Sequence, residues 1–395
     1  MDVLISGASV AGPALAYWLG RAGHQVTVVE IAPAPRTGGY SVDFRGGTHL
    51  SVLRMMGVLD ELRALDTGGT PYRFVAADGS RRSGLPGDFA GGDLEVARSE
   101  LSRVLREHSA AEYVYGDAIA ALTETSTGVR VDFERGGSRV FDLVVGADGM
   151  HSGVRRLAFG PEERFVTHLG CHVAGWELPC PAGVDRTVQL YNEPGRMASV
   201  GAHHGDPSRA STFFAFRAGP LDVDRRDLGA QRKVLADRFA GMGWRTGELV
   251  DALWDSPGLY FDAVSRVDVP SWSRGRIVLL GDAGYGATVG GMGTGTAVVA
   301  AYALAGELAL AGTGHGAASA RGGHEAAFAA YERRLRRFVK RCQRGGRGTG
   351  AFLAPATAFR IRMRDRVLNS RRLSGMLMAE SQKNSTGVAL PDYPL

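Results

Sequence analysis

The first thirty residues place the strongest constraint on what this chain can fold into. They contain an apolar strand pattern (DVLISG), a glycine turn from Gly7 to Gly12, an apolar helix pattern at about 13–22 and a second strand pattern (QVTVVE). Pro13 suits the first turn of a helix, because its missing N–H has no partner there. Strand, helix and strand at this spacing form a βαβ unit. The sequence therefore predicts an α/β fold built on a parallel sheet.

The turn GASVAG has the setting of a dinucleotide-binding site, because it follows a strand and opens a helix. Backbone N–H groups and the positive dipole end of that helix favour a pyrophosphate. Gly7, Ser9, Ala11 and Gly12 are candidate cofactor-binding residues, with Ser9 where a glycine is usual. Glu30 ends the second strand 18 residues after Gly12, close to the spacing of about 20 for an acid that binds a ribose 2′-OH. A carboxylate there repels a 2′-phosphate, which favours FAD or NAD over NADP.

The later segments alternate between helix and strand patterns. Helices are expected at about 48–65 and 99–109, and strands at 128–134 and 139–147. From about 161 to 268 the pattern changes to irregular, aromatic-rich strands, which predict an inserted, mainly antiparallel sheet. The chain then returns to a buried strand, RIVLLGDA, followed by a glycine loop and a long apolar helix from about Thr296.

Composition excludes several classes of protein. The chain has 395 residues, of which 44% are hydrophobic, enough for two to three domains with substantial cores. Its three cysteines lack CxxC spacing, which argues against a disulfide framework or zinc ribbon and favours a reducing cytoplasm. No secretory signal is expected. The apolar run 296–312 contains Glu307 and is short for a membrane span, so a buried helix is preferred.

The positive charge is concentrated near the C-terminus. The net charge is +5, but residues 332–372 contain 14 basic and two acidic residues, a local charge of +12. No aromatic platform or nucleic-acid motif accompanies this segment. We expect a solvated, arginine-rich helical face and no nucleic-acid partner or stable membrane insertion. Guidance of an anionic nucleotide, or contact with an acidic carrier or lipid surface, is the alternative.

Two later motifs separate FAD from NAD. The segments DLVVGADGMHSGVRR (142–156) and GRIVLLGDAGYGATVGGMGTG (275–295) resemble the DG and GD motifs of class A flavoprotein monooxygenases, the para-hydroxybenzoate hydroxylase family. Residues 36–46 resemble the flavin-contacting loop of that family, especially in tetracycline-inactivating monooxygenases and actinobacterial tailoring enzymes. The final LPDYP also resembles a recurrent C-terminus of such enzymes. The resemblance covers almost the whole chain in the right order.

The resemblance implies a set of FAD contacts. Arg98 resembles the arginine that reaches FAD, and Asp148, with Arg155, resembles the DG pair near the pyrophosphate, where a purely structural ion pair is the alternative. Asp282 is implied to bind ribityl hydroxyls. The other implied contacts are Arg36, Asp43, Arg45, Gly293, Thr294 and Gly295. The last three lie in the glycine loop that leads into the helix from about Thr296, whose N–H groups would stabilise negative charge on the flavin.

The implied activity is that of a single-component monooxygenase. NADPH or NADH reduces FAD, O2 adds to give a C4a-hydroperoxide, and one oxygen atom passes to an aromatic or polyketide-like molecule, most simply as hydroxylation in secondary metabolism such as antibiotic biosynthesis. The cofactor supplies this chemistry, so no catalytic side chain is required. His203 and His204 could deprotonate a phenol, but a solvated loop is preferred for them. A monomer or weak homodimer is expected.

A division into domains follows from the resemblance. Residues 1–70, 95–160 and 270–325 are expected to form a discontinuous Rossmann-like FAD-binding domain. Residues 71–94 and 161–269 are expected to form the substrate domain, and residues 326–395 a C-terminal helical region.

The substrate pocket is expected to be aromatic. Its candidate residues are Trp176, Tyr191, Phe214 and Phe216, together with Thr288 and Val289 near the flavin. Strand alternation places Phe214 and Phe216 on one face and Phe213 on the other, and packing in a core is the alternative. The family usually has Ala-Ala-His after the GD pair and a proline before the glycine loop. Gly284, Tyr285 and Thr288-Val289 replace these here.

Rival functions remain within the same fold. An epoxidase or a Baeyer–Villiger oxygenase fits the same motifs. A halogenase is disfavoured because the chain has no Trp-x-Trp pair, and a disulfide reductase because it has no CxxC. The alternative outside the enzymes is a protein that binds flavin or a nucleotide without catalysing a redox reaction.

Overall fold

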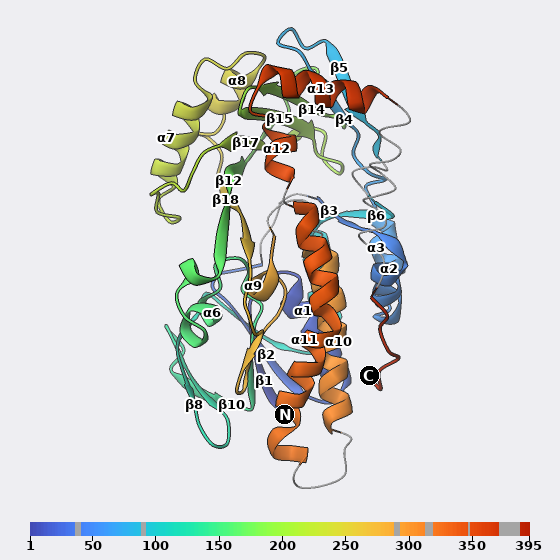
Figure 1. The fold of residues 1–395 in the computed structure, drawn as a ribbon, viewed down its shortest axis with the longest axis vertical. Coiled ribbons are helices and arrows are strands. Elements are labelled where there is room, and N and C mark those ends of the chain that lie inside the picture. Colours follow the sequence, from blue (N-terminus) through green and yellow to red (C-terminus); the bar gives the residue numbers. More distant parts are fainter. Residues whose placement is uncertain (36–40, 88–91, 288–292, 313–318, 347, 371–387) are drawn as a thin grey trace.

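The computed structural model describes residues 1–35, 41–87, 92–287, 293–312, 319–346, 348–370 and 388–395. Arg36, Thr288 and Val289 lie outside the described residues. The chain builds a lower part around a parallel sheet and an upper part around a larger, mainly antiparallel sheet (Figure 1). The expected α/β architecture is confirmed.

The lower part is organised by a six-stranded sheet. In spatial order its strands are β19 (Ser273–Arg274), β20 (Ile277–Leu279), β11 (Leu143–Gly146), β1 (Asp2–Ser6), β2 (Gln25–Glu30) and β7 (Glu112–Tyr115). All neighbouring pairs are parallel except β19 with β20. The predicted βαβ unit is present, with α1 (Ala11–Arg21) between β1 and β2.

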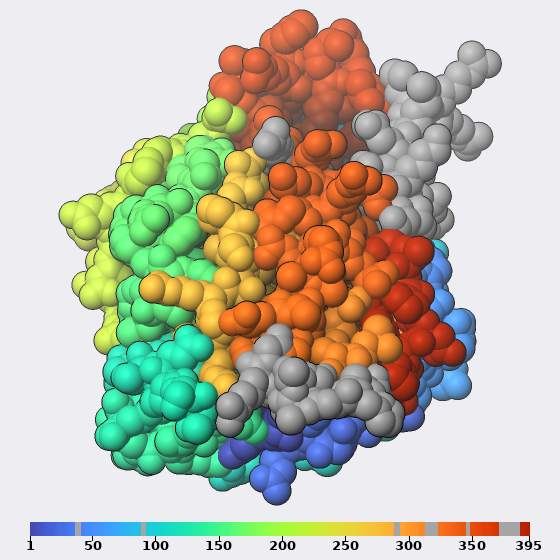
Figure 2. All heavy atoms as spheres, turned by 60° about the horizontal axis from the view of Figure 1, so that its bottom comes forward, coloured from blue at the N-terminus to red at the C-terminus, as the bar shows by residue number. Residues whose placement is uncertain are grey.

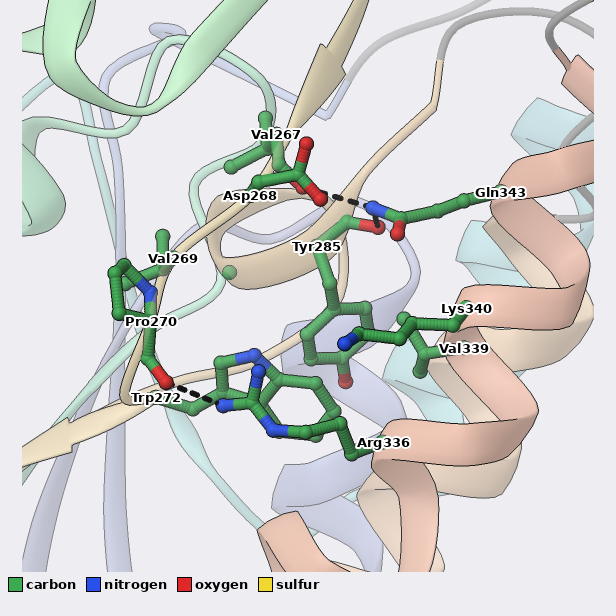
Figure 3. Close-up of a pocket in the computed structure, with 11 residues that line it drawn as sticks. Val267, Asp268, Val269, Pro270, Trp272, Tyr285, Arg336, Val339, Lys340 and Gln343 are labelled. Carbon is green, nitrogen blue, oxygen red and sulfur yellow. Dashed lines mark hydrogen bonds between the residues drawn. The ribbon is translucent and has the colours of Figure 1, made fainter.

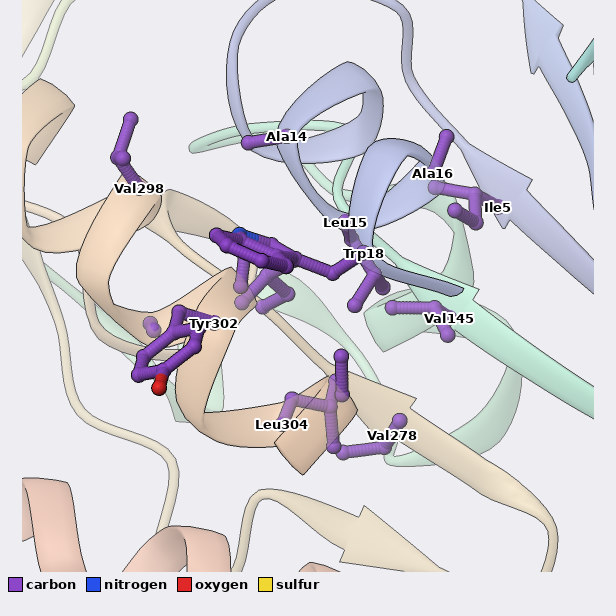
Figure 4. Packing of buried hydrophobic residues seen from close by; sticks show 14 of the residues in the cluster. Ile5, Ala14, Leu15, Ala16, Trp18, Val145, Val278, Val298, Tyr302 and Leu304 are labelled. Carbon is purple, nitrogen blue, oxygen red and sulfur yellow. The ribbon is translucent and has the colours of Figure 1, made fainter. Parts of the chain in front are cut away.

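Layers cover the parallel sheet on both faces. Helix α1 packs against α10 (Gly293–Gly312), which in turn packs against α11 (Ser319–Gly346). Trp18 of α1 and Tyr302 of α10 meet in this layer with ring centroids 4.8 Å apart (Figure 4). A three-stranded sheet of β8 (Ile119–Glu124), β9 (Val129–Phe133) and β10 (Ser138–Phe141) lies on the other side (Figure 1). The same buried core runs through all three layers.

Helix α10 is apolar enough to cross a membrane but belongs to the core. It is the one helix in the described part of the chain that has the necessary length and hydropathy, and 78% of its most apolar stretch is buried inside the protein. The position of α10 between α1 and α11 explains its apolar composition, because a helix surrounded by protein needs no polar face.

The upper part is a nine-stranded sheet. Seven of its strands lie in the order β18 (Tyr260–Val267), β12 (Val166–Gly175), β17 (Phe214–Arg217), β15 (Arg196–Ala202), β14 (Val188–Glu193), β4 (Tyr72–Val75) and β5 (Arg81–Leu85). The other two are β13 (Glu177–Pro179) and β16 (Arg209–Thr212). Helices α7 (Leu228–Phe239) and α8 (Thr246–Asp251) pack on one face, and α12 (Thr349–Leu353) and α13 (Ala358–Asn369) on the other.

Smaller elements connect the two parts. They are β3 (Ser41–Phe44) paired with β6 (Leu94–Ala97), the helices α2 (Gly46–Met55), α3 (Leu59–Ala64), α5 (Arg98–Glu107), α6 (Gly153–Ala158) and α9 (Asp282–Tyr285), and the short 3-10 helix η1 (Glu162–Arg164). The single helix predicted at 48–65 is wrong, because Gly57 adopts a φ of 74° and ends α2 before α3 begins. The single strand predicted at 139–147 is also wrong, because it divides at Asp142 into β10 and β11, which belong to different sheets.

The last residues of the chain complete the layer around α10. The Tyr393 ring lies over Gly306, where a Cβ would come within 2.1 Å of the ring. Its hydroxyl donates to Glu307 at 2.7 Å, and Arg334 of α11 donates to the same carboxylate at 2.8 Å. Figure 2 shows residues 388–395, in dark red, lying against the orange surface of α10 and α11. The buried acid of α10 is thus paired and hydrogen-bonded, as a buried charge must be.

Replacing Gly306 with alanine tests this contact. The added methyl would collide with the Tyr393 ring, so we expect G306A to lower the free energy of unfolding by about 1–3 kcal/mol, measured by urea denaturation. G312A on the same helix is the control, because a Cβ there meets no atom within 4 Å. Equal stability of G306A and G312A would contradict the close packing of Tyr393.

Candidate functional site

The candidate cofactor residues gather at one edge of the parallel sheet. β1, β2, β11 and β20 run in the same direction, so their carboxyl ends meet there. Gly7 follows β1, Glu30 ends β2, Asp148 follows β11 and Asp282 follows β20. Ligands of open α/β sheets bind outside the carboxyl ends of their strands.

The glycine turn is packed too tightly for a side chain at Gly7 or at Gly12. Gly7 has a φ of 110°, and a Cβ there would lie 2.4 Å from the carbonyl oxygen of Ala147. A Cβ at Gly12 would lie 1.9 Å from the carbonyl oxygen of Gly7. Both glycines are therefore required, and they bring the start of α1 directly onto the end of β1.

Ser9, which replaces the usual middle glycine, has two stabilising neighbours. Arg98 donates from Nη2 to the Ser9 hydroxyl at 2.9 Å, and the Ser102 hydroxyl donates to the Ser9 carbonyl at 2.8 Å. Arg98 and Ser102 both lie on α5, which fixes the turn from outside. The role of Ser102 was missed by the sequence reasoning, although it lies one helical turn after Arg98.

Glu30 bonds to the turn, whereas Asp148 fixes the loop after β11. Glu30 accepts from the backbone N–H groups of Ala8 at 2.9 Å and Ala32 at 3.0 Å. Asp148 accepts from the Ser152 hydroxyl and from the backbone N–H of Val154. Burial nonetheless raises the pKa of the Asp148 carboxyl. The loop that Asp148 fixes lies directly against Gly7.

Arg155 of the DG motif connects two segments of the site by hydrogen bonds. Its side chain is fully buried and donates to the carbonyl oxygens of Met150 at 2.6 Å and Ala283 at 2.8 Å. It also forms an ion pair with Glu162 at 3.3 Å. Through these bonds Arg155 connects the loop after β11 to the helix after β20, which is a structural role.

Asp282 and the start of α10 form the other wall of the site. Burial raises the pKa of the Asp282 carboxyl, and the positive charge of Arg98 opposes this shift, so the two side chains lie within electrostatic reach. Gly293 leaves room beside the carboxylate, because a Cβ there would lie 3.2 Å from Asp282 Oδ1. Gly293, Thr294 and Gly295 form the first turn of α10, whose N–H groups have no partner within the helix.

The loop residues Asp43 and Arg45 form an ion pair with each other. Next to them lies His49, which sequence reasoning missed. It is 1% exposed and packs against Gly295, where a Cβ would lie 2.5 Å from its ring. Its Nδ1 accepts from the Arg45 N–H at 3.2 Å, while Nε2 has no partner within the described residues. Burial lowers the pKa of His49 to about 4, so the ring is neutral and its proton lies on Nε2.

These groups fit FAD. The tight glycine turn and the free N–H groups of two helix starts suit phosphate and flavin oxygens. The carboxylates of Glu30 and Asp282 suit sugar and ribityl hydroxyls, and the His49 Nε2–H is an unused donor. Among the described residues, no group of histidine, cysteine and acidic side chains could hold a metal ion.

The four aromatic residues expected at the substrate pocket lie elsewhere. Trp176, Tyr191, Phe214 and Phe216 pack with α7 and α8 in a buried core. Trp176 Nε1 donates to the Leu249 carbonyl of α8 at 3.1 Å. They face away from α12 and α13 and form a core, which was the alternative to a substrate pocket. The expected alternation itself is present, because Phe213 and Ala215 lie on the opposite, inner face.

The inner face carries two tyrosines near the cofactor residues. Tyr72 lies on β4, and burial, reinforced by Glu95 and Asp43, raises its pKa to about 12. Tyr260 lies on β18, and burial raises its pKa, with Asp262 and Asp282 reinforcing the shift and Arg98 opposing it. His203, in contrast, bonds to Ser211 at 2.6 Å, and His204 is exposed.

A charged cluster joins the upper and lower parts. His151, next to the DG motif, places Nδ1 3.1 Å from Glu162 Oε1 and Nε2 3.1 Å from Asp262 Oδ1 on β18. Burial alone would lower the pKa of His151, but the hydrogen bonds to Asp262 and Glu162 outweigh it and raise the pKa. Burial would raise the pKa of Glu162, but His151 and Arg225 hold it at about 2.

Comparison with known proteins agrees with this geometry. Residues 1–342 match the FAD binding domain family. A flavin-dependent monooxygenase from an unknown prokaryotic organism is 33% identical over 99% of this chain and 98% of its own. The solved structures of the tetracycline destructases Tet(51) and Tet(55) superpose with TM-scores of 0.86 and 0.84, at 29% and 32% identity. Both cover 99% of this chain, and the matches span 99% and 98% of theirs.

Fold and site define an FAD-binding flavoprotein of the monooxygenase class. Within that class, the chain belongs to the class A FAD-dependent monooxygenases. The resemblance found in the DG and GD motifs is thereby confirmed.

The cluster around His151 predicts a pH-dependent stability. The folded protein raises the pKa of His151 above its ordinary value of about 6.5. The contribution of His151 to the free energy of unfolding is therefore complete below about pH 6.5, and it is lost as the pH rises through the raised pKa. The lowered pKa of Glu162 means that its part is lost as pH falls below about 4.5 towards 2. We expect H151Q to cost on the order of 1 kcal/mol at pH 5–6, and less above pH 8, in urea denaturation.

H204Q is the control for this measurement, because His204 is exposed. A loss in H151Q that stays constant from pH 5 to pH 9 would contradict the charged form of His151 in the cluster.

Proposed function

We propose that this monooxygenase uses NADPH or NADH and O2 to insert one oxygen atom into a planar aromatic or polyketide-like molecule, most simply by hydroxylation. The likeness to tetracycline destructases over almost the full chain carries the proposal. Their name refers to tetracycline, a polycyclic molecule rich in oxygen.

The residues of the site have separate tasks in this proposal. When bound, FAD supplies the redox chemistry that activates dioxygen. The turn Gly7–Gly12, Arg98 and Glu30 would hold its dinucleotide part, and Asp282 its ribityl hydroxyls. The first turn of α10 would stabilise negative charge at the flavin edge with its N–H groups. Asp43, Arg45 and Asp148 complete the proposed binding set, to which Arg36 belongs by resemblance.

The two tyrosines would position the substrate. The middle of the inner face is closed, because Val173 and Ala215 are fully buried and α12 and α13 pack over it. Tyr72 and Tyr260 lie towards opposite edges of the sheet, on β4 and β18. Tyr260 is 42% exposed, so part of its ring can contact a ligand. A phenol group near the cofactor residues suits a flat molecule with oxygen atoms at its edge, because a hydroxyl group fixes the orientation of a bound ring.

The same proposal places the protein in the cytoplasm as a monomer or weak homodimer. Cys171, Cys180 and Cys342 are free thiols, which suits a reducing compartment. The arginine-rich helices α11 and α13 would present a solvated surface there.

Loss of FAD from variants tests the binding residues. We expect E30A and D282A each to raise the dissociation constant for FAD about tenfold to hundredfold, because each loses a hydrogen bond to a charged group. Flavin fluorescence during titration of the apoprotein measures this change. E30Q retains an acceptor and should lose less than E30A, and D60A at an exposed position is the control. Unchanged FAD affinity in both alanine variants would refute the assignment.

A substrate screen tests the reaction. We expect the purified protein to be yellow and its oxidation of NADPH or NADH to accelerate with tetracyclines or other polycyclic phenols. Mass spectrometry of the product should show a gain of one oxygen atom. Protein that stays colourless with added FAD would refute the function, whereas yellow protein whose NADPH and NADH oxidation no aromatic compound accelerates would refute the substrate class.

A further inference from the structure

The basic C-terminal segment supplies none of the cofactor contacts proposed above. Residues 332–372 contain 14 basic and two acidic residues, and their described part includes the second half of α11 and the whole of α13. Both helices lie on the near side of the molecule in Figure 1, α11 in front of α10 and α13 in front of β14 and β15. The surface of α11 is also in view in Figure 2. The positive charge of this segment is therefore presented at the surface of the protein.

Both acids of the segment are turned into the protein. Glu332 is paired with Arg336 one turn along α11. Asp365 is 6% exposed and pairs with Arg82 at 3.1 Å and with Arg364 at 3.0 Å. The outward sides of α11 and α13 therefore have no carboxylate of this segment to neutralise their cations.

One side of α11 has four exposed cations. They are Arg333, Arg337, Lys340 and Arg344. Their spacing of three or four residues places them along one face of the helix, over a length of about 16 Å. None of the four forms an ion pair or a side-chain hydrogen bond in the part of the chain that the structure describes. Figure 3 shows the contrast with Arg336, which donates to the Pro270 carbonyl at 2.6 Å, whereas no bond is drawn to Lys340.

The outward side of α13 combines cations with apolar side chains. Phe359 is 67% exposed and Met363, one turn later, is 40% exposed. Arg366 follows on the same side and forms no ion pair with a described residue. The opposite side of the helix is already used for packing, because Ile361 and Leu368 are buried. A single exposed apolar residue needs no explanation, but here two share a helix face with unpaired cations.

We propose that the outward sides of α11 and α13 together form a binding face for the surface of an anionic lipid bilayer. The cations would pair with lipid phosphates, and Phe359 and Met363 would enter the boundary between headgroups and acyl chains. The contact is peripheral and reversible. Helix α10, the one described helix that is long and apolar enough to span a bilayer, stays buried in the core.

A bilayer explains these observations better than three other partners. A second copy of this chain in a twofold contact would place cations against cations, which repel each other. A nucleic acid would pair with the arginines but would leave Met363 in water. An acidic protein would have to cover two separate helices, whereas a bilayer supplies phosphates and an apolar layer over any area. The cytoplasmic leaflet of a membrane is anionic, which agrees with the compartment proposed above. The inference does not depend on the proposed substrate.

Co-sedimentation of the full-length, FAD-loaded protein with vesicles tests the proposal. We expect binding to vesicles of equal parts phosphatidylcholine and phosphatidylglycerol, and none to phosphatidylcholine alone. Raising the salt concentration from about 0.1 M to about 1 M shortens the screening length from about 10 Å to about 3 Å and should release most of the protein. Equal binding to both vesicles overturns the proposal. So does a protein that stays in solution with the anionic vesicles, as it would if its partner were an acidic protein or a nucleic acid.

A triple variant removes three charges from the outward side of α11, R333Q/R337Q/R344Q. Each charge near an anionic surface contributes about fivefold to the partition coefficient, so we expect a loss of about a hundredfold. The control triple variant loses the same net charge at exposed positions on other elements, R54Q/R135Q/R226Q, and should bind nearly as well as the wild type. Equal losses in the two variants would mean that net charge alone causes binding, and would overturn the assigned face.

The substitution F359A tests the apolar part of the contact. We expect it to lower the partition coefficient on the anionic vesicles about threefold or more, because it removes apolar surface from the membrane boundary. V140A is the control, because Val140 is 59% exposed on β10, and it should bind like the wild type. Flavin absorbance shows that each variant is folded and retains FAD. An F359A protein that binds as well as the wild type would remove α13 from the contact and overturn the proposed face.

Discussion

The close approach of α1 to the end of β1 is the constraint on which the cofactor site depends. The two glycines let the helix start sit directly on the strand end, and every other element of the site is placed relative to that contact. Glu30 reaches the turn from β2, Ala147 covers it from β11, and α5 holds it from outside. The parallel direction of the strands is what brings these groups to one edge.

The sequence was sufficient to predict site residues whose positions follow from the order of strands and helices. Gly7, Gly12 and Glu30 could be predicted because a βαβ unit fixes where its turn and its second strand end. Side chains that reach the site from distant segments could not be predicted in this way. His49 shows no local pattern, and only the packing of α2 against α10 brings it to Gly295.

The upper sheet shows a second limit of prediction from the sequence. Alternation correctly separated Phe213 from Phe214 and Phe216, but no local signal in a strand says which face a neighbouring helix will cover. Here both faces are covered, one by α7 and α8 and the other by α12 and α13, and Phe214 and Phe216 lie under the first pair. Large aromatic residues in these strands are therefore explained by a core, and their size alone could not distinguish a core from a substrate pocket.

The docking of Tyr393 over Gly306 links residues 388–395 to the helix that faces the cofactor site. Helix α10 supplies the first turn at that site, yet the groups that pair its buried Glu307 come from α11 and from Tyr393. A change at residues 388–395 would therefore leave a buried carboxylate with one partner fewer and open space beside Gly306. Residues that touch no cofactor thus help to fix the position of a helix that does.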